Sequence, residues 1–337
     1  MANILVTGGA GYIGAHTVRA LLARGEQVTI VDNLATSKAA TIDKLKREGD
    51  VLFAHVDIND TPSLDAVFAT RKVDAVIHFA AWKNAGESML KPAKYFENNV
   101  AGTNRLLDSM QRAGVHRIVF SGSCSVYGTP QRLPVDESFP VGPESVYAHT
   151  KLMCEQVMDW FDKRHAIRYV SLRYFNAAGA SPDGLIGEEP ALSANLIPVV
   201  MEATLGRRPR IQVFGDDYPT PDGTCIRDYV HVTDLASAHV LALQSLLRGE
   251  SGFRAFNLGN CNGTSVKEVI AAVERVSGKK VPFVVSQRRA GDPPMLVGSP
   301  EKIQRELGWQ PRHSDIETIV RTAWQWHAAH PDGYGDK

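Results

Sequence analysis

Long hydrophobic runs, an excess of one charge and paired cysteines are all missing from this sequence. No uncharged apolar run approaches the ~18–20 residues that a membrane-spanning helix needs, so we expect no membrane partner. Lys and Arg number 37 and so do Asp and Glu, and a net charge of zero gives no indication of nucleic-acid binding. The N-terminus lacks the positive region of a signal peptide, and we expect none.

The cysteines are few and isolated. Cys124, Cys154, Cys225 and Cys261 form no CxxC pair and have no zinc-site spacing, so we expect no metal site. Reduced thiols of this kind are typical of a cytoplasmic protein, and we expect that location. The apolar share of 44% and the charged share of 22% are those of a folded globular protein, which excludes disorder, collagen and coiled coil.

Short apolar runs alternate with segments of helical period through the first half of the chain. The predicted strands are Ile4–Thr7, Val28–Val31, Leu52–His55, Val73–His78, Arg117–Ser121 and Tyr169–Arg173. The predicted helices are Tyr12–Arg24, Leu64–Thr70, Lys91–Ala113 and Val146–Arg164. This alternation predicts an α/β fold of Rossmann type, in which a doubly wound parallel sheet is covered by helices on both faces. The nearly continuous apolar strands agree with that burial.

After about Phe175 the pattern loosens, because Gly and Pro interrupt it repeatedly. We therefore expect a first domain over residues 1–175 and a smaller C-terminal lobe over residues 176–337. We also expect the chain to cross between the two lobes more than once. The polar tail Pro331–Lys337 is expected to fray.

A glycine-rich turn follows the first predicted strand. Gly8, Gly11 and Gly14 open a helix, and this spacing lets backbone amides approach a pyrophosphate at the helix N-terminus. Asp32 ends the second strand, where a carboxylate accepts hydrogen bonds from ribose hydroxyls and repels a 2′-phosphate. Asn33 supplies no cation, so the pattern favours NAD over NADP. The alternatives are an ordinary glycine loop and Asp32 as a helix cap.

Tyr147 and Lys151 lie four residues apart and share one helix face. A lysine beside the phenol is predicted to lower its pKa, which is ~10 without perturbation, and to make Tyr147 a general base. Upstream, a Ser-rich turn follows a predicted strand and places Ser123 at the edge where open α/β sheets bind ligands. Taken alone, the YxxxK pair could be two surface residues without a function, and the Ser-rich turn could have only a structural role. Together they favour a catalytic site.

The glycine turn, the strand-end Asp, the Ser and the YxxxK pair occur in the order of the extended short-chain dehydrogenase/reductase family, which the chain resembles. Further segments resemble the UDP-glucose 4-epimerases within it: His78–Ser88, Asn98–Val100, Leu172–Asn176, Gly223–Val232 and Arg288–Asp292. The resemblance implies an isomerase of galactose metabolism that interconverts UDP-glucose and UDP-galactose with NAD through a 4-keto intermediate. It also implies a homodimer.

The resemblance implies a role for each matching residue. Tyr147 would remove the C4 hydroxyl proton while hydride passes to NAD, Ser123 would hydrogen-bond the reacting oxygen, and Lys151 would hold the nicotinamide ribose. The implied cofactor-binding residues are Gly8, Gly11, Tyr12, Ile13, Gly14, Asp32, Asn33, Asp57, Ile58, Phe79, Ala80, Lys83, Asn99, Tyr147, Lys151 and Tyr174. The implied UDP-sugar-binding residues are Ser123, Tyr147, Asn176, Asn195, Arg227, Arg289, Asp292 and Leu296.

Leu296 stands where the family often has Tyr or Cys. Since Leu leaves more room for an N-acetyl group, we expect UDP-N-acetylglucosamine and UDP-N-acetylgalactosamine to be accepted too; the alternative is that the backbone closes the pocket. A dehydratase would need an acidic pair after the Ser, where Cys124 and Ser125 stand. Two further alternatives are an epimerase or decarboxylase acting on a UDP-uronate and a non-catalytic NAD-binding protein of the same fold.

Overall fold

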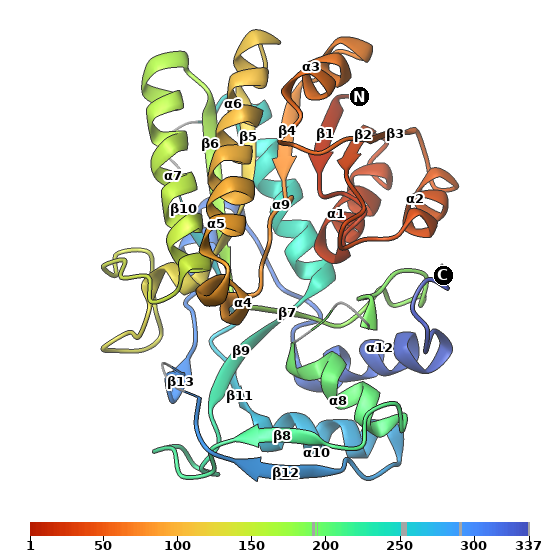
Figure 1. Ribbon diagram of the computed structural model, residues 1–337, viewed down its shortest axis with the longest axis vertical. Helices are drawn as coiled ribbons and strands as arrows, with labels where there is room; N and C mark the ends of the chain where they lie inside the picture. Colours follow the sequence, from red (N-terminus) through yellow and green to blue (C-terminus); the bar gives the residue numbers. More distant parts are fainter. Residues whose placement is uncertain (191–192, 194, 251–254, 290–291, 336–337) are drawn as a thin grey trace.

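Seven parallel strands form the central sheet of the upper lobe in the computed structural model, which describes residues 1–190, 193, 195–250, 255–289 and 292–335 (Figure 1). Their order across the sheet is β10-β6-β5-β4-β1-β2-β3. The strands are β1 Asn3–Thr7, β2 Gln27–Asp32, β3 Val51–His55, β4 Ala75–His78, β5 Arg117–Ser123, β6 Arg168–Tyr174 and β10 Ala255–Leu258. The predicted fold class is confirmed.

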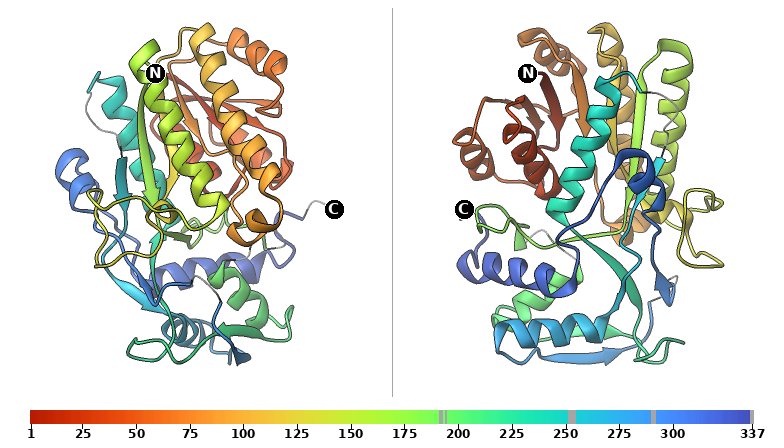
Figure 2. Two further views of the ribbon diagram at one scale, coloured as in Figure 1. Left: turned by 60° about the vertical axis from the view of Figure 1, so that its left-hand side comes forward. Right: turned by 180° about the vertical axis from the view of Figure 1, so that it is seen from behind.

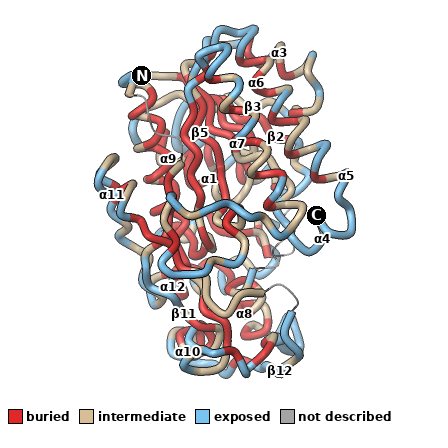
Figure 3. The backbone as a smooth tube through the Cα atoms, turned by 90° about the vertical axis from the view of Figure 1, so that its left-hand side faces the viewer, coloured by how far each residue is buried: buried red, intermediate tan, exposed pale blue. Residues whose placement is uncertain are grey.

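Helices cover both faces of this sheet (Figure 2). One face packs against α1 Tyr12–Leu22 and α9 Val232–Leu247, and the other against α3 Thr61–Thr70, α6 Gly102–Arg112 and α7 Val146–His165. Alternate residues of β1 serve the two faces, because Ile4 and Val6 join one apolar core while Leu5 joins the other. Burial on both sides explains the apolar strands, which run through the middle of the molecule (Figure 3).

The chain returns to the upper lobe after first leaving it. The helix α9 packs against α1, and β10 pairs with β6 at the edge of the central sheet. The short helix α11 Glu301–Leu307 then packs against β10 and α9. The boundary between residues 175 and 176 stays a prediction, since segments from both sides of it share the central sheet.

The lower lobe is built around three helices that pack on one another: α8 Leu196–Thr204, α10 Val266–Ser277 and α12 Ile316–Ala329. The strand β9 Ile226–His231 pairs with β7 Asn176–Ala178, β11 Gly263–Ser265 and β13 Met295–Leu296. A separate parallel pair joins β8 Ile211–Phe214 to β12 Phe283–Ser286. This lobe faces the carboxyl ends of the central strands (Figure 1).

Two sequence predictions are wrong in detail. The expected single helix Lys91–Ala113 is broken: α4 Ala85–Leu90, which the prediction omitted, is followed by α5 Pro92–Tyr95, a π-helical turn Phe96–Ala101, and then α6. Pro92 begins α5, where the missing amide hydrogen of a proline costs nothing. A further missed helix, α2 Ala39–Lys46, lies beside α1 and β3.

The tail is also more ordered than its composition suggests, although residues 336–337 lie outside the described part. The Tyr334 hydroxyl donates to the Gly187 carbonyl at 3.0 Å and accepts from the Gly187 amide at 3.2 Å. Its ring lies 5.0 Å from that of Trp326. Within the described residues, no helix has the length and apolar character needed to cross a bilayer. Nor do these residues include a group of three or more His, Cys, Asp or Glu placed to hold a metal ion.

Candidate active site

A cavity of about 1970 Å³ lies where the carboxyl ends of the central strands face the lower lobe. Open α/β sheets bind ligands at this edge. The predicted residues that line the cavity are Gly8, Gly11, Tyr12, Ile13, Gly14, Asp32, Asn33, Ile58, Phe79, Ala80, Lys83, Tyr147, Lys151, Tyr174, Asn176, Asn195, Arg227, Arg289, Asp292 and Leu296. The other three, Asp57, Asn99 and Ser123, are not among the residues that line it.

The glycine turn leaves no space for side chains at two of its positions. A Cβ on Gly8, which has a φ of 69°, would lie 2.7 Å from the Ala80 nitrogen, and a Cβ on Gly14 would lie 2.2 Å from the Gly8 carbonyl oxygen. The chain can therefore turn sharply from β1 into α1 only with glycine at both positions. The turn exposes the N-terminus of α1 to the cavity, and this arrangement fits the pyrophosphate of a dinucleotide.

Asp32 is buried at the end of β2, with hydrogen bonds to both carboxylate oxygens. Oδ2 accepts from the Ala10 amide at 3.0 Å, and Oδ1 accepts from the Leu34 amide at 2.9 Å and from Ser37 Oγ at 2.8 Å. These contacts hold the carboxylate at the cavity, where Oδ2, which accepts only one hydrogen bond, has a lone pair left to accept from a ribose hydroxyl.

Asp57 supports this end of the cavity. It accepts a hydrogen bond from Asn33 Nδ2 at 2.7 Å and others from the amide and side chain of Asn59. Burial opposes its ionisation, but these hydrogen bonds outweigh burial and hold the pKa of Asp57 below its usual value. The contact of Asp57 is therefore with Asn33, which itself lines the cavity.

Ser123, Tyr147 and Lys151 converge at the end of β5. The side chains of Tyr147 and Ser123 interact, and Ser123 Oγ lies 2.8 Å from Ser125 Oγ. Lys151, one turn along α7 from Tyr147, donates from Nζ to the Ser121 carbonyl at 2.7 Å. The α7 helix sets the spacing of Tyr147 and Lys151, and β5 brings Ser123 to them.

The expected lowering of the Tyr147 pKa is wrong for this structure. Burial raises the pKa of Tyr147 to about 12, and the hydrogen bond to Ser123 counters it only in part. Burial also lowers the pKa of Lys151, to about 8. Removing both groups from water therefore outweighs their attraction, because burial penalises the charged form of each.

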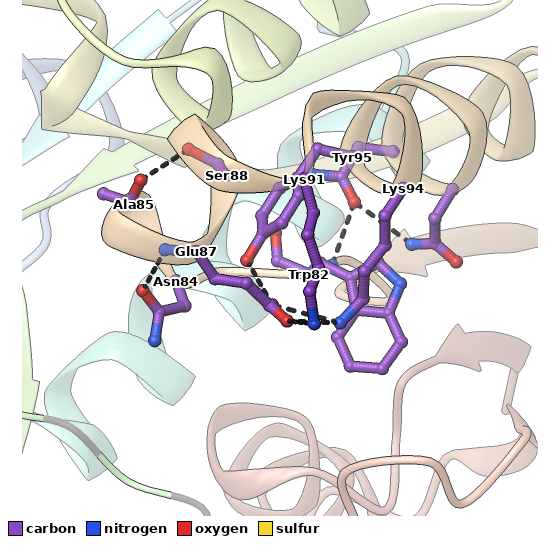
Figure 4. Close-up of polar contacts among 10 residues, drawn as sticks. Trp82, Asn84, Ala85, Glu87, Ser88, Lys91, Lys94 and Tyr95 are labelled. Carbon is purple, nitrogen blue, oxygen red and sulfur yellow. Dashed lines mark hydrogen bonds and ion pairs between the residues drawn. The ribbon is translucent and has the colours of Figure 1, made fainter.

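The loop after β4 forms another wall of the cavity and carries Trp82, which Figure 4 shows beside Lys94. Asn99 Oδ1 accepts from the Trp82 amide at 2.9 Å, while Nδ2 donates to the Trp82 carbonyl at 3.0 Å and to Thr150 Oγ1 at 3.1 Å. Lys94 Nζ lies 3.6 Å from the centre of the Trp82 ring, and Glu87 binds Lys94 at 3.0 Å. Asn99 thereby joins this loop to α7, between Tyr147 and Lys151.

Two arginines and one carboxylate meet in the lower half of the cavity. Asp292 forms ion pairs with Arg227 of β9 and, at 2.9 Å, with Arg289. Leu296 lies beside Arg227, because β13 pairs with β9 in parallel register. In the matching segment Arg288–Asp292, residues 290–291 lie outside the described residues. Guanidinium groups gathered at one point suit a diphosphate, which they bind through paired hydrogen bonds.

Comparisons with known proteins agree with this geometry. The model of the NAD dependent epimerase/dehydratase family matches residues 4–259. The UDP-glucose 4-epimerase of Halalkalibacterium halodurans is 50% identical over 332 residues, which span 98% of this chain and 97% of that protein. The chain belongs to the UDP-glucose 4-epimerases.

Solved structures of epimerases resemble the whole chain. The UDP-glucose 4-epimerase of Brucella ovis in complex with NAD has a TM-score of 0.92 and 44% identity, and the match covers 96% of this chain and 98% of that one. The enzyme of Bifidobacterium longum in complex with NAD+ and UDP has a TM-score of 0.93 and 39% identity, with 98% and 99% covered. The family resemblance inferred from the motifs is confirmed.

The epimerase cleft also contains a carboxylate that the motifs did not reveal. Glu188 is nearly buried, and its Oε1 accepts from Lys83 Nζ at 3.4 Å and from Asn195 Nδ2 at 3.2 Å. Lys83 was expected on the cofactor side and Asn195 on the substrate side. No pattern in the sequence marks Glu188, because its partner Lys83 lies 105 residues away along the chain.

Proposed function

We propose that this epimerase interconverts UDP-glucose and UDP-galactose with NAD as its cofactor, by oxidation and re-reduction at C4. The observation that carries the proposal is the meeting of Ser123, Tyr147 and Lys151 at the edge of a cavity. The same cavity is lined by the glycine turn and, on its other side, by Arg227 and Arg289. The UDP-glucose 4-epimerases among the relatives support the substrate assignment.

The chemistry that NAD supplies when bound is the reversible acceptance of a hydride from C4. Tyr147 takes the proton of the C4 hydroxyl through its phenol oxygen and gives it back when the opposite face of the sugar is reduced. Ser123 hydrogen-bonds the same sugar oxygen and orients Tyr147. Lys151 binds the nicotinamide ribose, and its positive charge favours the phenolate when the proton moves. Ser123 and Lys151 are buried, which keeps water away from one side of the reacting atoms, while Tyr147 faces the cavity.

We assign the remaining predicted residues by the half of the cleft they occupy. The cofactor would bind along Gly8, Gly11, Tyr12, Ile13, Gly14, Asp32, Asn33, Ile58, Phe79, Ala80, Lys83 and Tyr174, with Asp57 and Asn99 supporting the lining. Asp32 favours NAD over NADP. Arg227 and Arg289 would hold the diphosphate, oriented by Asp292, with Asn176 and Asn195 nearby. Firm binding of UDP leaves the 4-keto sugar free to turn over between the two hydride transfers.

Leu296 is the basis for proposing a second pair of substrates. It lines the cavity beside Arg227 and packs near Val126 and Tyr127. A leucine at this wall is smaller than a tyrosine would be, so an N-acetyl group gains room. UDP-N-acetylglucosamine and UDP-N-acetylgalactosamine are therefore proposed as additional substrates.

We also propose a homodimer in the cytoplasm. Apolar side chains stand exposed on neighbouring helices: Leu90 on α4 is 84% exposed and Trp160 on α7 is 59% exposed. Pairing of this face with a second copy would cover both. The cytoplasmic location rests on the free cysteines, two of which, Cys154 and Cys225, are buried. Light scattering after gel filtration, with Trp160→Glu as the interface variant, tests the dimer.

The decisive experiment incubates the purified protein with UDP-galactose and no added reductant, and follows UDP-glucose by chromatography. Equilibration of the two sugars supports the proposal. UDP-galacturonate in place of UDP-galactose tests the uronate alternative. Binding of NAD without turnover of any of these sugars would instead indicate the non-catalytic alternative.

A further inference from the structure

Ser88 lies in α4, outside every segment assigned above to catalysis or ligand binding. It is fully buried, and its hydroxyl makes two hydrogen bonds. Oγ donates to the Ala85 carbonyl at 2.6 Å (Figure 4). The same oxygen accepts from the backbone amide of Tyr147 at 3.0 Å. A residue of one helix thus binds the acid–base residue of another.

The amide of Tyr147 needs such a partner from outside its helix. The first amides of an α-helix have no acceptor within the helix itself. In α7 the N-cap residue is Ser145, and its Oγ accepts from the Ala148 amide at 3.2 Å. The N-cap side chain therefore satisfies Ala148, and Ser88 satisfies Tyr147.

Tyr147 is consequently held at both ends. Its backbone amide is fixed by Ser88 of α4, and its hydroxyl is fixed by Ser123 of β5. Between these points the side chain has only two rotatable bonds, so the position of the backbone decides where the phenol oxygen lies. A displacement of about 1 Å at a reacting group can cost ~10²-fold in rate.

We propose that Ser88 is a positioning residue, which holds the start of α7 so that the Tyr147 hydroxyl meets Ser123 and the reacting sugar oxygen. The inference rests on the function proposed above, because it assigns Ser88 to the support of that acid–base group. Ser88 itself touches neither substrate nor cofactor in this assignment.

The test compares Ser88→Ala with Ser245→Ala. Ser245 is also fully buried, and its Oγ donates to the Ala242 carbonyl at 2.8 Å, three residues earlier in α9. The control variant therefore removes the same buried hydroxyl and the same kind of helical hydrogen bond, but no contact with α7. Thermal unfolding of both variants shows that each is folded.

Two measurements follow, one of activity and one of structure. In Ser88→Ala, kcat for UDP-galactose is expected to fall about 10–100-fold, while KM and the affinity for UDP change less than about threefold. Hydrogen exchange, read by mass spectrometry on the peptide that covers the first turn of α7, is expected to speed up. Ser245→Ala should leave both measurements near wild type.

Equal kcat in the two variants, or a Ser88→Ala loss seen in KM alone, would overturn the positioning role. Unchanged exchange in the first turn of α7 would also overturn it, whatever the activity. A wild-type protein that fails to interconvert the sugars would refute the proposed function, while the exchange measurement would still decide whether Ser88 holds α7.

Discussion

Replacement of Tyr147 by Phe removes one oxygen atom and leaves the other side chains of the site in place. Phe keeps the ring, which is packed in the first turn of α7, and removes the hydroxyl that hydrogen-bonds Ser123. Burial raises the pKa of this phenol to about 12, so Tyr147 must first lose its own proton to act as the base, and the positive charge of Lys151 favours that loss. The expected loss is therefore in the chemical step.

The magnitude follows from the role of the hydroxyl. A lost acid–base group costs ~10²–10⁴ in kcat, which corresponds to about 3–5 kcal/mol of transition-state free energy. The free energy of unfolding should change by only about 1 kcal/mol, because a single hydrogen bond is lost together with the cost of burying its hydroxyl. The variant is thus expected to lose most of its activity and to keep most of its stability.

The assay measures initial rates of UDP-glucose formation over a range of UDP-galactose concentrations, with UDP binding by calorimetry. Tyr169→Phe is the matched control, since its buried ring lies at the start of β6, the end of the strand opposite the cavity, and its hydroxyl binds Asp159 at 2.8 Å. A Tyr147→Phe variant whose kcat stays within about tenfold of wild type would refute the reasoning, because the proton must then move through another group. A loss of UDP binding would place Tyr147 in ligand binding instead.

Gly14→Ala should purify with little NAD, as measured by chromatography of the released cofactor, since its Cβ would lie 2.2 Å from the Gly8 carbonyl oxygen. The control Gly142→Ala, whose Cβ would have open space around it, should retain the cofactor. Glu155→Gln should lower the free energy of unfolding by about 3–5 kcal/mol in urea, because it removes the negative charge that neutralises the buried Arg173 guanidinium. A loss no larger than the ~1 kcal/mol expected for the exposed Arg71–Asp50 pair would contradict this. Burial lowers the pKa of Lys151 from 10.5 to about 8, so between these pH values the unfolded state binds the proton and the folded state releases it. The free energy of unfolding of wild type should therefore rise relative to that of Lys151→Met as pH increases from about 8 to 10.5. A constant difference between the two proteins would argue against this burial effect. Leu296→Tyr should reduce kcat/KM for UDP-N-acetylgalactosamine and leave kcat/KM for UDP-galactose unchanged. Equal kcat/KM for UDP-N-acetylgalactosamine in wild type and variant would show that Leu296 does not control the choice of substrate.

The local pattern of apolar and polar residues predicted much of the fold. The alternation of apolar runs and helical segments predicted six of the seven strands of the central sheet within a few residues, because strands buried on both faces are apolar throughout; β10 was not predicted. The glycine turn was readable for a similar reason, since the backbone around Gly8 and Gly14 admits no other residue. The pairing of Tyr147 with Lys151 follows from the helical repeat alone.

The break in the predicted helix Lys91–Ala113 was harder to see. Pro92 marks the start of α5, but the π-helical turn that follows has no signal in the pattern. It matters because Asn99, within that turn, hydrogen-bonds the loop at Trp82 and Thr150 of α7. The motif named Asn99 as a site residue, and only the fold shows that it is not among the residues that line the cavity.

The amino-acid sequence by itself determined the strands, the glycine turn and the spacing of the YxxxK pair, because each depends on neighbours within a few residues. Only the tertiary structure decided the return of β10 to the central sheet, the meeting of Lys83 and Asn195 at Glu188, and the hold of Ser88 on Tyr147. It also decided the pKa of Tyr147, where burial outweighs the nearby lysine. The physical reason is that contacts between distant segments and the removal of water are properties of the packed chain, and no local pattern of residues records them.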